Sequence, residues 1–345
     1  MPSERRPRLT PPIADVRRAV RDALAGLPDG SLVLVALSGG ADSLALAAGV
    51  AFEAPRAGLR AGAVIVDHGL QQGSADAASR AADLAAELGL DPVVVRRVRV
   101  DGEGGPEAAA RAARHEALDA AAREHGAAAV LLGHTLDDQV ETVLLGLARG
   151  SGGRSLAGMA PASRSAGGVL RLRPLLGIRR ETTRQACLDA GLEPWDDPHN
   201  ADPSYARVRV RWRVLPVLEA ELGPGIAEAL ARTAEQLRED DEAFAEQIEE
   251  FIEEICAPAE AGIAVSARAL AANPAALRQR VVRHVVQSEF GVSLSRAQTL
   301  EVTRLATDWH GQGPVSLPGG VLATRAGAHL VLSTTGSTEI LPHDH

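Results

Sequence analysis

The feature that most constrains the fold is the alternation of apolar runs and helical patterns along the first 150 residues. Each run is continuously apolar, which is typical of a strand buried on both faces of a parallel sheet. Parallel strands joined by right-handed helical crossovers build a doubly wound α/β domain. The predicted strands are 31–37, 61–66, 92–95 and 127–132, and the predicted helices are 13–27, 42–52, 74–89, 106–125 and 136–149.

A glycine-rich turn follows the first predicted strand, and the next helix begins inside it. Glycine permits positive φ and close backbone approach, and a helix N-terminus directs N–H groups at a bound anion. The glycine-rich turn is not a Walker A loop, because that motif needs a lysine and the 36 basic residues of this chain are all arginine. We predict a phosphate site at Ser38, Gly39, Gly40, Ala41, Asp42 and Ser43.

Three carboxylates are predicted at the same edge of the sheet. Asp42 lies in the glycine turn, and Asp138 and Glu141 lie about one helical turn apart after the fourth strand. Carboxylates beside a phosphate need a cation between them, so we predict that Asp138 and Glu141 bind Mg²⁺, or that the three acids bind a substrate ammonium. The alternative is that these acids only favour a helix N-terminus. His134 is a candidate proton carrier or a structural strand-end histidine.

Length and composition limit the class of protein. With 345 residues, two domains are expected, and 46% hydrophobic residues suit a globular protein. No apolar segment is long enough for a signal peptide or a membrane span, which predicts a cytoplasmic protein. Cys187 and Cys256 have no metal-binding or redox spacing, so we expect buried, reduced thiols. The oligomeric state stays open, with a homodimer as one option.

The later part of the chain contains a strongly acidic stretch. Ten acidic residues and one arginine lie between Glu235 and Glu254, with an apolar stripe at helical spacing, so we expect a helical linker over 223–257. Helical patterns at 274–289 and 295–308 then precede a strand–turn–strand pattern at 309–322. This order predicts a small α+β domain over 258–335 and a flexible tail at 336–345.

Arginines recur at alternate positions before the acidic stretch, at Arg207, Arg209, Arg211 and Arg213, with Trp212 among them. Arginines with aromatic residues are typical of RNA contact by phosphate binding and base stacking. The net charge of −9 is unusual for an RNA-binding protein. Two interpretations stay open: an RNA contact at Arg207, Arg209 and Arg211, or a solvated helix whose aromatic residues pack in the core.

An ordered set of motifs resembles one family. The glycine turn resembles the pyrophosphate loop (PP-loop) of the N-type ATP pyrophosphatases, and the other motifs narrow the resemblance to the bacterial tRNA(Ile)-lysidine synthases over about residues 31–217. Two positions depart from the family pattern: His115 replaces an aromatic residue, and Val208 replaces an asparagine after arginine. The matching segments are Val66–Leu70, Ala110–Arg114, Gly133–Thr142, Arg149–Gly153, Arg173–Leu176, Asp196–Asn200, Asp202–Arg207 and Val214–Pro216.

The resemblance implies an adenine nucleotide alpha hydrolase-like domain over 1–222, followed by the linker and a substrate-recognition domain. It implies that ATP, with Mg²⁺, adenylates the C2 oxygen of the wobble cytidine (position 34) in an isoleucine tRNA with a CAU anticodon, after which free L-lysine displaces AMP. Asp42, Asp138 and Glu141 would hold the metal or the amine, and Arg114 the α-phosphate. The alternatives are a thiolase-like enzyme of the same superfamily, which generally needs cysteines, and a non-catalytic nucleotide-binding module.

Overall fold

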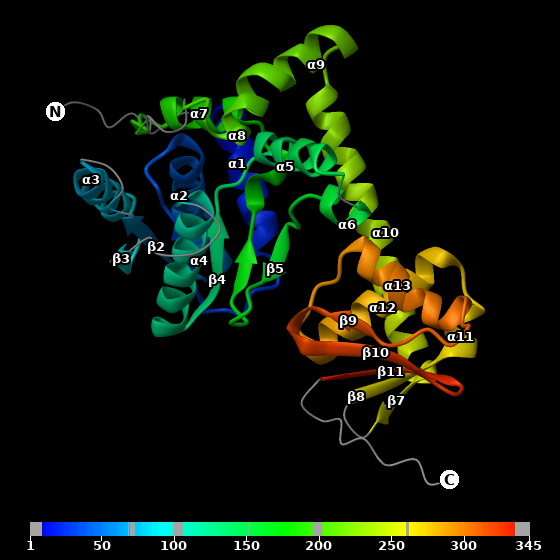
Figure 1. Cartoon of the computed structure of the whole chain (residues 1–345). Helices are drawn as coiled ribbons and strands as arrows, with labels where there is room; N and C mark the ends of the chain where they lie inside the picture. Colours follow the sequence, from blue (N-terminus) through cyan, green and yellow to red (C-terminus); the bar gives the residue numbers. More distant parts are fainter. Residues whose placement is uncertain are drawn as a thin grey trace, which may run out of the picture. The chain divides into compact units, whose positions relative to one another are not determined.

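The structure is a computed structural model that describes residues 9–67, 69, 73–98, 106–150, 152–195, 202–259 and 262–334. Contacts divide the chain into two compact units, residues 1–238 and 239–345, and each unit has its own sheet (Figure 1). The division lies within a long helix, α10 (Ile226–Ile255), in the stretch that the sequence predicts as a linker. The predicted tail at 336–345 lies outside the described residues.

The first unit is built on a six-stranded sheet with the order β3-β2-β1-β4-β6-β5. All neighbouring pairs are parallel except β5 and β6, which are antiparallel. Every residue of β1 is buried, as its continuous apolar run predicts. The strands are β1 (Leu32–Ala36), β2 (Arg60–Asp67), β3 (Val93–Arg97), β4 (Ala127–Leu132), β5 (Ala162–Arg164) and β6 (Leu170–Leu172).

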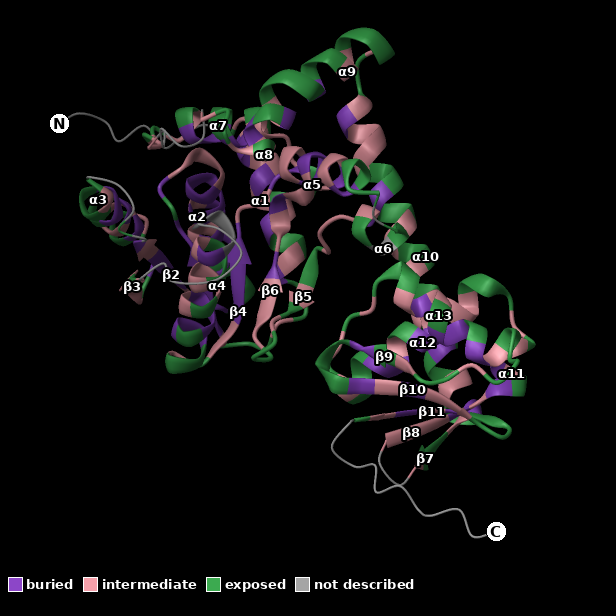
Figure 2. Cartoon of the chain, in the orientation of Figure 1, coloured by how far each residue is buried: buried purple, intermediate pink, exposed green. Residues whose placement is uncertain are grey.

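Helices pack on both faces of this sheet, which confirms the predicted doubly wound α/β fold (Figure 2). One face carries α4 (Pro106–Glu124), whose Leu118 shares a buried cluster with Leu34 and Val130. Because side chains alternate along a strand, the residues of β1 on either side of Leu34 point to the opposite face of the sheet. That face carries α1 (Pro11–Leu24), α2 (Ala41–Glu53), α3 (Ser74–Glu87) and α7 (Arg180–Asp189).

The remaining helices of the first unit follow β4 or precede α10. Leu136 of α5 (Leu136–Ala148) packs with Leu215 and with Ala227, which lie in α9 and α10. This contact packs α5 against the last two helices of the first unit. The other elements of this part are α6 (Gly153–Leu156), α8 (Ala206–Arg209), a π-helical turn (Val210–Val214) and α9 (Leu215–Leu222).

The second unit packs helices on a five-stranded antiparallel sheet with the order β7-β8-β11-β10-β9. Val281, Leu305 and Leu332 belong to its separate core. No described helix is long and apolar enough to cross a membrane. The elements are β7 (Cys256–Ala259), β8 (Gly262–Ser266), α11 (Ala267–Ala271), α12 (Ala275–Phe290), α13 (Arg296–Thr307), β9 (Val315–Leu317), β10 (Val321–Ala326) and β11 (His329–Thr334).

Candidate active site

The glycine turn forms a hydrogen-bonded loop between β1 and α2. The backbone N–H of Ser38 donates to Oγ of Ser43 at 3.1 Å, and this hydroxyl donates to the carbonyl of Gly40 at 2.9 Å. Gly39 has a φ of +84°, a left-handed conformation that favours glycine. α2 begins at Ala41, so the N–H groups of its first turn lie at the loop. The loop therefore presents the donors that a phosphate group needs.

Two other segments hold this loop in place. A Cβ atom at Gly133, directly after β4, would lie 3.0 Å from Cα of Ser43, so only glycine fits there comfortably. The backbone N–H of Trp195 donates to the carbonyl of Gly39 at 2.9 Å. The close approach at Gly133 aligns the end of β4 with the start of α2. The predicted motif at 196–200 lies outside the described residues.

The three predicted carboxylates meet around one guanidinium group, that of Arg180. Its Nε lies 3.3 Å from Oδ2 of Asp42, its Nη2 lies 2.8 Å from Oδ1 of Asp138, and its Nη1 lies 3.3 Å from Oε1 of Glu141. Arg180 begins α7, and its backbone N–H donates to Asp137 at 2.8 Å. We call Asp42, Asp138, Glu141 and Arg180 the acidic cluster.

A second guanidinium, that of Arg211, also pairs with this cluster. Its Nε lies 2.7 Å from Oε1 of Glu141 and its Nη2 lies 3.2 Å from Oε2. Glu141 is 1% exposed, so these ion pairs are weakly screened by water. Asp138 also accepts hydrogen bonds from the N–H and the hydroxyl of Thr135, at 2.8 and 2.9 Å. Among the residues that the structure describes, two guanidiniums thus face three carboxylates, which leaves one negative charge of the cluster uncompensated.

The pKa values of Asp42 and Asp138 are shifted in opposite directions. Burial raises the pKa of Asp42, against the opposing effect of hydrogen bonds from Thr183 and Arg180. Burial also acts on Asp138, but Arg180 and the N–H of Thr135 outweigh it, and its pKa lies below the usual value. Burial opposes charge on Arg180 as well, yet Asp138, Glu141 and Asp42 raise its pKa. A further cation would therefore stabilise the charged form of Asp42 more than that of Asp138.

The acidic cluster does not fit Mg²⁺ as it is arranged. Mg²⁺ demands near-octahedral oxygen ligands, whereas Asp42, Asp138 and Glu141 each already accept a hydrogen bond from Arg180. Among the residues that the structure describes, no group of three or more histidine, cysteine, aspartate or glutamate side chains is placed to hold a metal ion. A metal bound by Asp138 and Glu141 would require Arg180 to withdraw.

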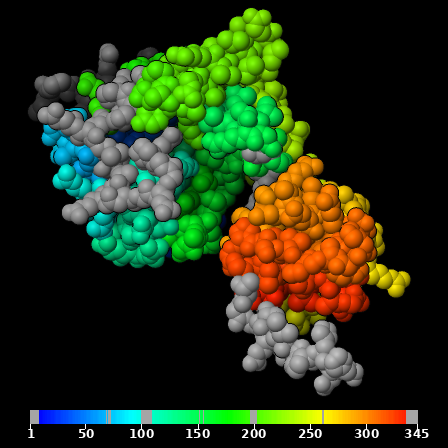
Figure 3. Space-filling model, viewed as in Figure 1, coloured from blue at the N-terminus to red at the C-terminus, as the bar shows by residue number. Residues whose placement is uncertain are grey.

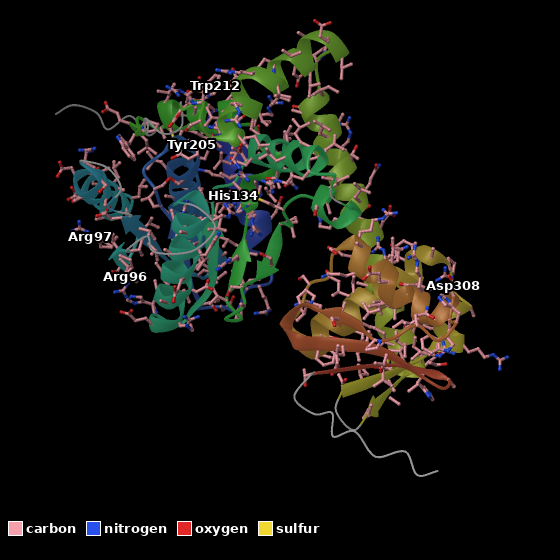
Figure 4. The ribbon with its side chains drawn as sticks, viewed as in Figure 1. Arg96, Arg97, His134, Tyr205, Trp212 and Asp308 are labelled. Carbon is pink, nitrogen blue, oxygen red and sulfur yellow. The ribbon has the colours of Figure 1, made fainter. Side chains whose placement is uncertain are left out.

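Basic side chains gather on the α4 face of the same sheet. β6 pairs with β4 through Val130 and Arg171, so both strands end at the same edge. Arg171 lies 2.8 Å from Asp119 of α4, and its Nη2 donates to the carbonyl of His115 at 3.5 Å. We call the following residues the cationic cluster: Arg111, Arg114 and His115 of α4, His134 after β4 (labelled in Figure 4), and Arg171 and Arg173 at the end of β6.

Burial first, and repulsion between neighbouring cations second, lower the pKa values in this cluster. Burial, with Arg171 and Arg111 nearby, lowers the pKa of His115 to about 4. Burial lowers the pKa of His134 to about 3, with Asp138 opposing the shift and Arg173 adding to it. Burial and neighbouring arginines also lower the pKa values of Arg114 and Arg173. Both histidines are therefore neutral at pH 7.

Buried side-chain nitrogen atoms without a hydrogen-bond partner concentrate in the cationic cluster. Within the described part of the chain they are Nδ1 of His115, Nδ1 of His134, Nε of Arg173 and, in the second unit, Nε of Arg278. Nη1 of Arg173 donates to the carbonyl of Ala160 at 2.8 Å and to Oγ of Ser163 at 3.0 Å, both neutral acceptors. The cluster thus combines an excess of positive charge with buried nitrogen atoms that lack hydrogen-bond partners.

The alternating arginines have different environments. Arg211 pairs with the acidic cluster, Nη2 of Arg207 donates to the hydroxyl of Thr142 at 3.3 Å, and Nη1 of Arg209 donates to two carbonyls of the preceding turn at 2.8 and 2.6 Å. Trp212 is 65% exposed, so it does not pack in the core as one interpretation required (Figure 4). Figure 3 shows the neighbouring α9 segment, in yellow-green, at the surface of the first unit.

Sequence reasoning missed Arg180 and Thr183, and it gave Arg173 no role. The hydroxyl of Thr183 donates to Oδ1 of Asp42. The only signal for Arg180 was indirect: converging carboxylates need cations, and in a chain without lysine only arginine and histidine supply them. That signal does not identify the residue, because Arg180 and Asp42 are 138 positions apart.

The two cysteines lie in different units. Cys187 is buried in α7, its Sγ donates to the carbonyl of Ala41 at 3.3 Å, and burial raises its pKa to about 12. Cys256 is partly buried at the start of β7, and burial raises its pKa to about 11. The prediction of a buried thiol is confirmed for Cys187, whereas Cys256 is only partly buried.

Two family models match the chain. Residues 14–218 match the PP-loop domain, and residues 265–330 match the TilS substrate binding domain. The first match spans the six-stranded sheet with both clusters, and the second lies in the second unit. Together they account for both folded units.

Curated relatives are similar over most of the chain. A protein from Leifsonia xyli with the name tRNA(Ile)-lysidine synthase is 66% identical over 294 residues, which are 85% of this chain and 87% of the relative. A protein of the same name from Salinispora tropica is 53% identical over 333 residues, 95% of this chain and 98% of the relative.

Among solved structures, the U34-tRNA thiolase NcsA from Methanococcus maripaludis is similar with a TM-score of 0.55 and 22% identity, over 66% of this chain and 80% of that chain. At this identity the likeness concerns the fold alone. It agrees with the parallel sheet of the first unit.

Proposed function

We propose that this chain, which belongs to the tRNA(Ile)-lysidine synthase family, attaches free L-lysine to C2 of the wobble cytidine (position 34) in an isoleucine tRNA with a CAU anticodon. Membership of the family makes it a ligase that uses ATP. Lysine, the CAU anticodon, Mg²⁺ and a cytoplasmic location are parts of the proposal. The observation that carries it is the meeting of a phosphate loop, an acidic cluster and a cationic cluster at one edge of the sheet.

In the first step, the C2 oxygen of cytidine attacks the α-phosphorus of ATP, and pyrophosphate leaves. The N–H groups of the loop at Ser38–Ser43 and of the first turn of α2 stabilise the charge of that leaving group. Arg114 is our candidate for binding the α-phosphate. Burial, with a smaller effect from Arg111, lowers the pKa of its guanidinium, so a bound phosphate would stabilise the charged form.

In the second step, the ε-amine of lysine attacks C2, the bond from C2 to the adenylated oxygen breaks, and AMP leaves. Lysine arrives as an ammonium ion, and the acidic cluster has one uncompensated negative charge to receive it. We assign the ammonium to Asp42, where burial raises the pKa and a further cation would stabilise the charged form. Asp138 and Glu141 hold Arg180 beside it. Mg²⁺, when bound with ATP, would neutralise phosphate charge, and we assign it no step here.

The attacking amine must first lose a proton. His134 is our candidate acceptor, because it is neutral at pH 7 and lies between the two clusters, under the influence of Asp138 on one side and Arg173 on the other. Its low pKa makes it a weak base in the free protein. The negative charge of a bound adenylate would raise that pKa toward the range of an effective base.

RNA contact outside this edge of the sheet is proposed at the alternating arginines. Arg209 and Trp212 are exposed, whereas Arg207 and Arg211 have partners on α5. The exposed pair therefore suits phosphate contact and base stacking best. The separation of Cys187 and Cys256 into different units favours the synthase over a thiolase-like enzyme.

The test combines purified protein, Mg-ATP, labelled lysine and an unmodified transcript of the isoleucine tRNA. We expect label in this RNA and none in a transcript whose wobble cytidine is replaced by uridine. Asp42→Ala and Asp138→Ala should each reduce AMP formation by about 100-fold or more, because they remove charge at the reacting groups. Asp22→Ala, at an exposed position, is the control.

Absence of label with well-folded wild-type protein would overturn the proposed function. Normal AMP formation in either variant would remove that residue from the reaction. Circular dichroism of each variant separates loss of activity from loss of folding.

A further inference from the structure

We propose that Arg173 binds a second phosphate in the active site, the RNA phosphodiester next to the target cytidine. This inference rests on the proposed function, because it concerns the RNA substrate of the same site. Arg173 directly follows β6, and β6 pairs with β4, which ends next to His134. Its guanidinium therefore lies in the cationic cluster and not in the phosphate loop.

The cationic cluster holds more positive charge than one phosphate neutralises. Arg171 has a carboxylate partner in Asp119, at 2.8 Å. No described carboxylate forms an ion pair with Arg114 or Arg173. The charged side chains that lower the pKa values of these two residues, in addition to burial, are other arginines. A buried cation without a counter-charge is costly. Two such guanidiniums can bind two anionic groups. The α-phosphate of ATP, which we assign to Arg114, is one of these groups.

The side chain of Arg173 is held ready for an anion. Nη1 donates to the carbonyl of Ala160 at 2.8 Å and to Oγ of Ser163 at 3.0 Å, so neutral acceptors fix one arm of the planar group. Nε is buried without a partner. A guanidinium oriented by one arm keeps its charge and its other arm for a phosphate oxygen. Nearby, Nδ1 of His115 and of His134 also lacks a hydrogen-bond partner.

The position of Arg173 favours RNA over ATP as the source of this phosphate. β1, which carries the phosphate loop, is separated from β6 by β4. Two strand spacings amount to about 10 Å. A pyrophosphate group bound at the loop therefore lies away from Arg173. Cytidine, in contrast, is joined through its ribose to a phosphodiester, so bringing the base to the α-phosphorus brings a separate phosphate into the same site.

The experiment measures binding of the CAU isoleucine tRNA transcript across a series of salt concentrations, and binding of ATP alone, for Arg173→Ala and the wild type. We expect the variant to bind the transcript about tenfold more weakly, since one charged hydrogen bond is lost. The slope of log affinity against log salt should fall by about 0.7, the value for one contact to a single strand. Affinity for ATP should stay within about twofold of the wild type.

Two matched controls isolate the charge. Ser163→Ala removes a hydrogen bond of Arg173 but keeps its guanidinium. Arg164→Ala removes an arginine of the adjacent strand whose Nη1 only donates to the carbonyl of Gly168, at 3.0 Å. Arg164→Ala should bind the transcript like the wild type, and Ser163→Ala, which removes one of the two acceptors of Nη1, should lose less affinity than Arg173→Ala. If Arg173→Ala does not fold, Arg173→Lys should keep the salt slope and Arg173→Gln should lose it.

Unchanged transcript affinity and salt slope in Arg173→Ala would overturn the inference. So would a loss of ATP affinity without a loss of RNA affinity, which would assign Arg173 to the nucleotide, or an equal loss in Ser163→Ala, which would make its role architectural. Lysine incorporation by the wild type is measured in parallel. Its failure would remove the proposed function, and the binding data would still decide whether Arg173 contacts RNA.

Discussion

The acidic and cationic clusters lie at the same edge of one sheet, yet their charges are balanced in different ways. In the acidic cluster, Arg180 and Arg211 pair with buried or partly buried carboxylates at 2.7 to 3.3 Å. In the described part of the cationic cluster, Arg171 has a carboxylate partner, whereas Arg114 and Arg173 do not. The protein therefore organises its acids with its own cations but leaves positive charge for phosphate groups to neutralise.

The largest expected effect comes from removing the buried acid that both guanidiniums share. Glu141→Gln removes the more deeply buried of the two acids that pair with both Arg180 and Arg211, the other being Asp138. We expect the free energy of unfolding of the first unit to fall by about 3 kcal/mol, since breaking a buried ion pair strands the remaining charge. Chemical denaturation followed by circular dichroism measures this change.

The control is Glu228→Gln, whose carboxylate pairs with Arg179 at 3.0 Å and is 41% exposed. An exposed pair contributes less than about 1 kcal/mol. Equal losses in the two variants would contradict internal balancing of the acidic cluster.

A smaller effect is expected from removing the central cation. In Arg180→Ala, Asp42 and Asp138 lose a counter-charge, and we expect about 2 kcal/mol of destabilisation together with loss of lysine incorporation. Added guanidinium at millimolar concentration should restore part of that activity, because the cavity left by the side chain fits the same ion. Arg179→Ala, one residue earlier and more exposed, serves as the control. If guanidinium rescues neither activity nor stability, Arg180 is not the resident cation of the cluster.

The smallest effect concerns pH and the cationic cluster. The pKa values of His115 and His134, about 4 and about 3, lie below the usual 6.5. The unfolded chain therefore takes up protons below pH 6.5 that the folded protein refuses, so the stability present above pH 6.5 is lost as pH falls toward these values. We expect a loss of about 1.4 kcal/mol between pH 7 and pH 6, about 0.7 kcal/mol from each histidine, that a His115→Phe, His134→Asn double variant lacks.

Thermal unfolding at several pH values measures this difference. His329→Gln, exposed in the second unit, is the control. The same pH dependence in the double variant and in the wild type would show that the two histidines do not sense the excess positive charge.

Local patterns predicted the elements that carry their own signal. The run 127–132 has the same bounds as β4, because it is apolar throughout and lies between Gly126 and Gly133. β5 and β6 were not predicted, since each has only three residues and includes arginine. They form because β6 extends the sheet beside β4 and β5 pairs with β6. β7, β8 and β11 were missed for a similar reason, as their pairing partners lie elsewhere in the chain or across a turn.

The residues of the candidate site also divide into those that a local motif predicts and those that depend on contacts across the fold. The loop at Ser38–Ser43 is a local motif, and topology brings Asp138 and Glu141 to it, so the sequence sufficed for both. Arg180 and Arg173 were not assigned roles, because their importance depends on which charges meet across the fold. No spacing along the chain indicates that Arg180 faces three acids or that Arg173 pairs with no carboxylate among the described residues.

The contact between Trp195 and the loop gives the protein an optical label of its own. The backbone of Trp195 bonds to Gly39, and its Cβ lies 3.8 Å from the place where a Cβ of Gly39 would stand. The other two tryptophans, Trp212 and Trp309, are 65% and 43% exposed. A nucleotide bound at the loop would alter the fluorescence of Trp195 more than that of the two exposed tryptophans. Nucleotide binding can therefore be followed by the intrinsic fluorescence of the unmodified protein.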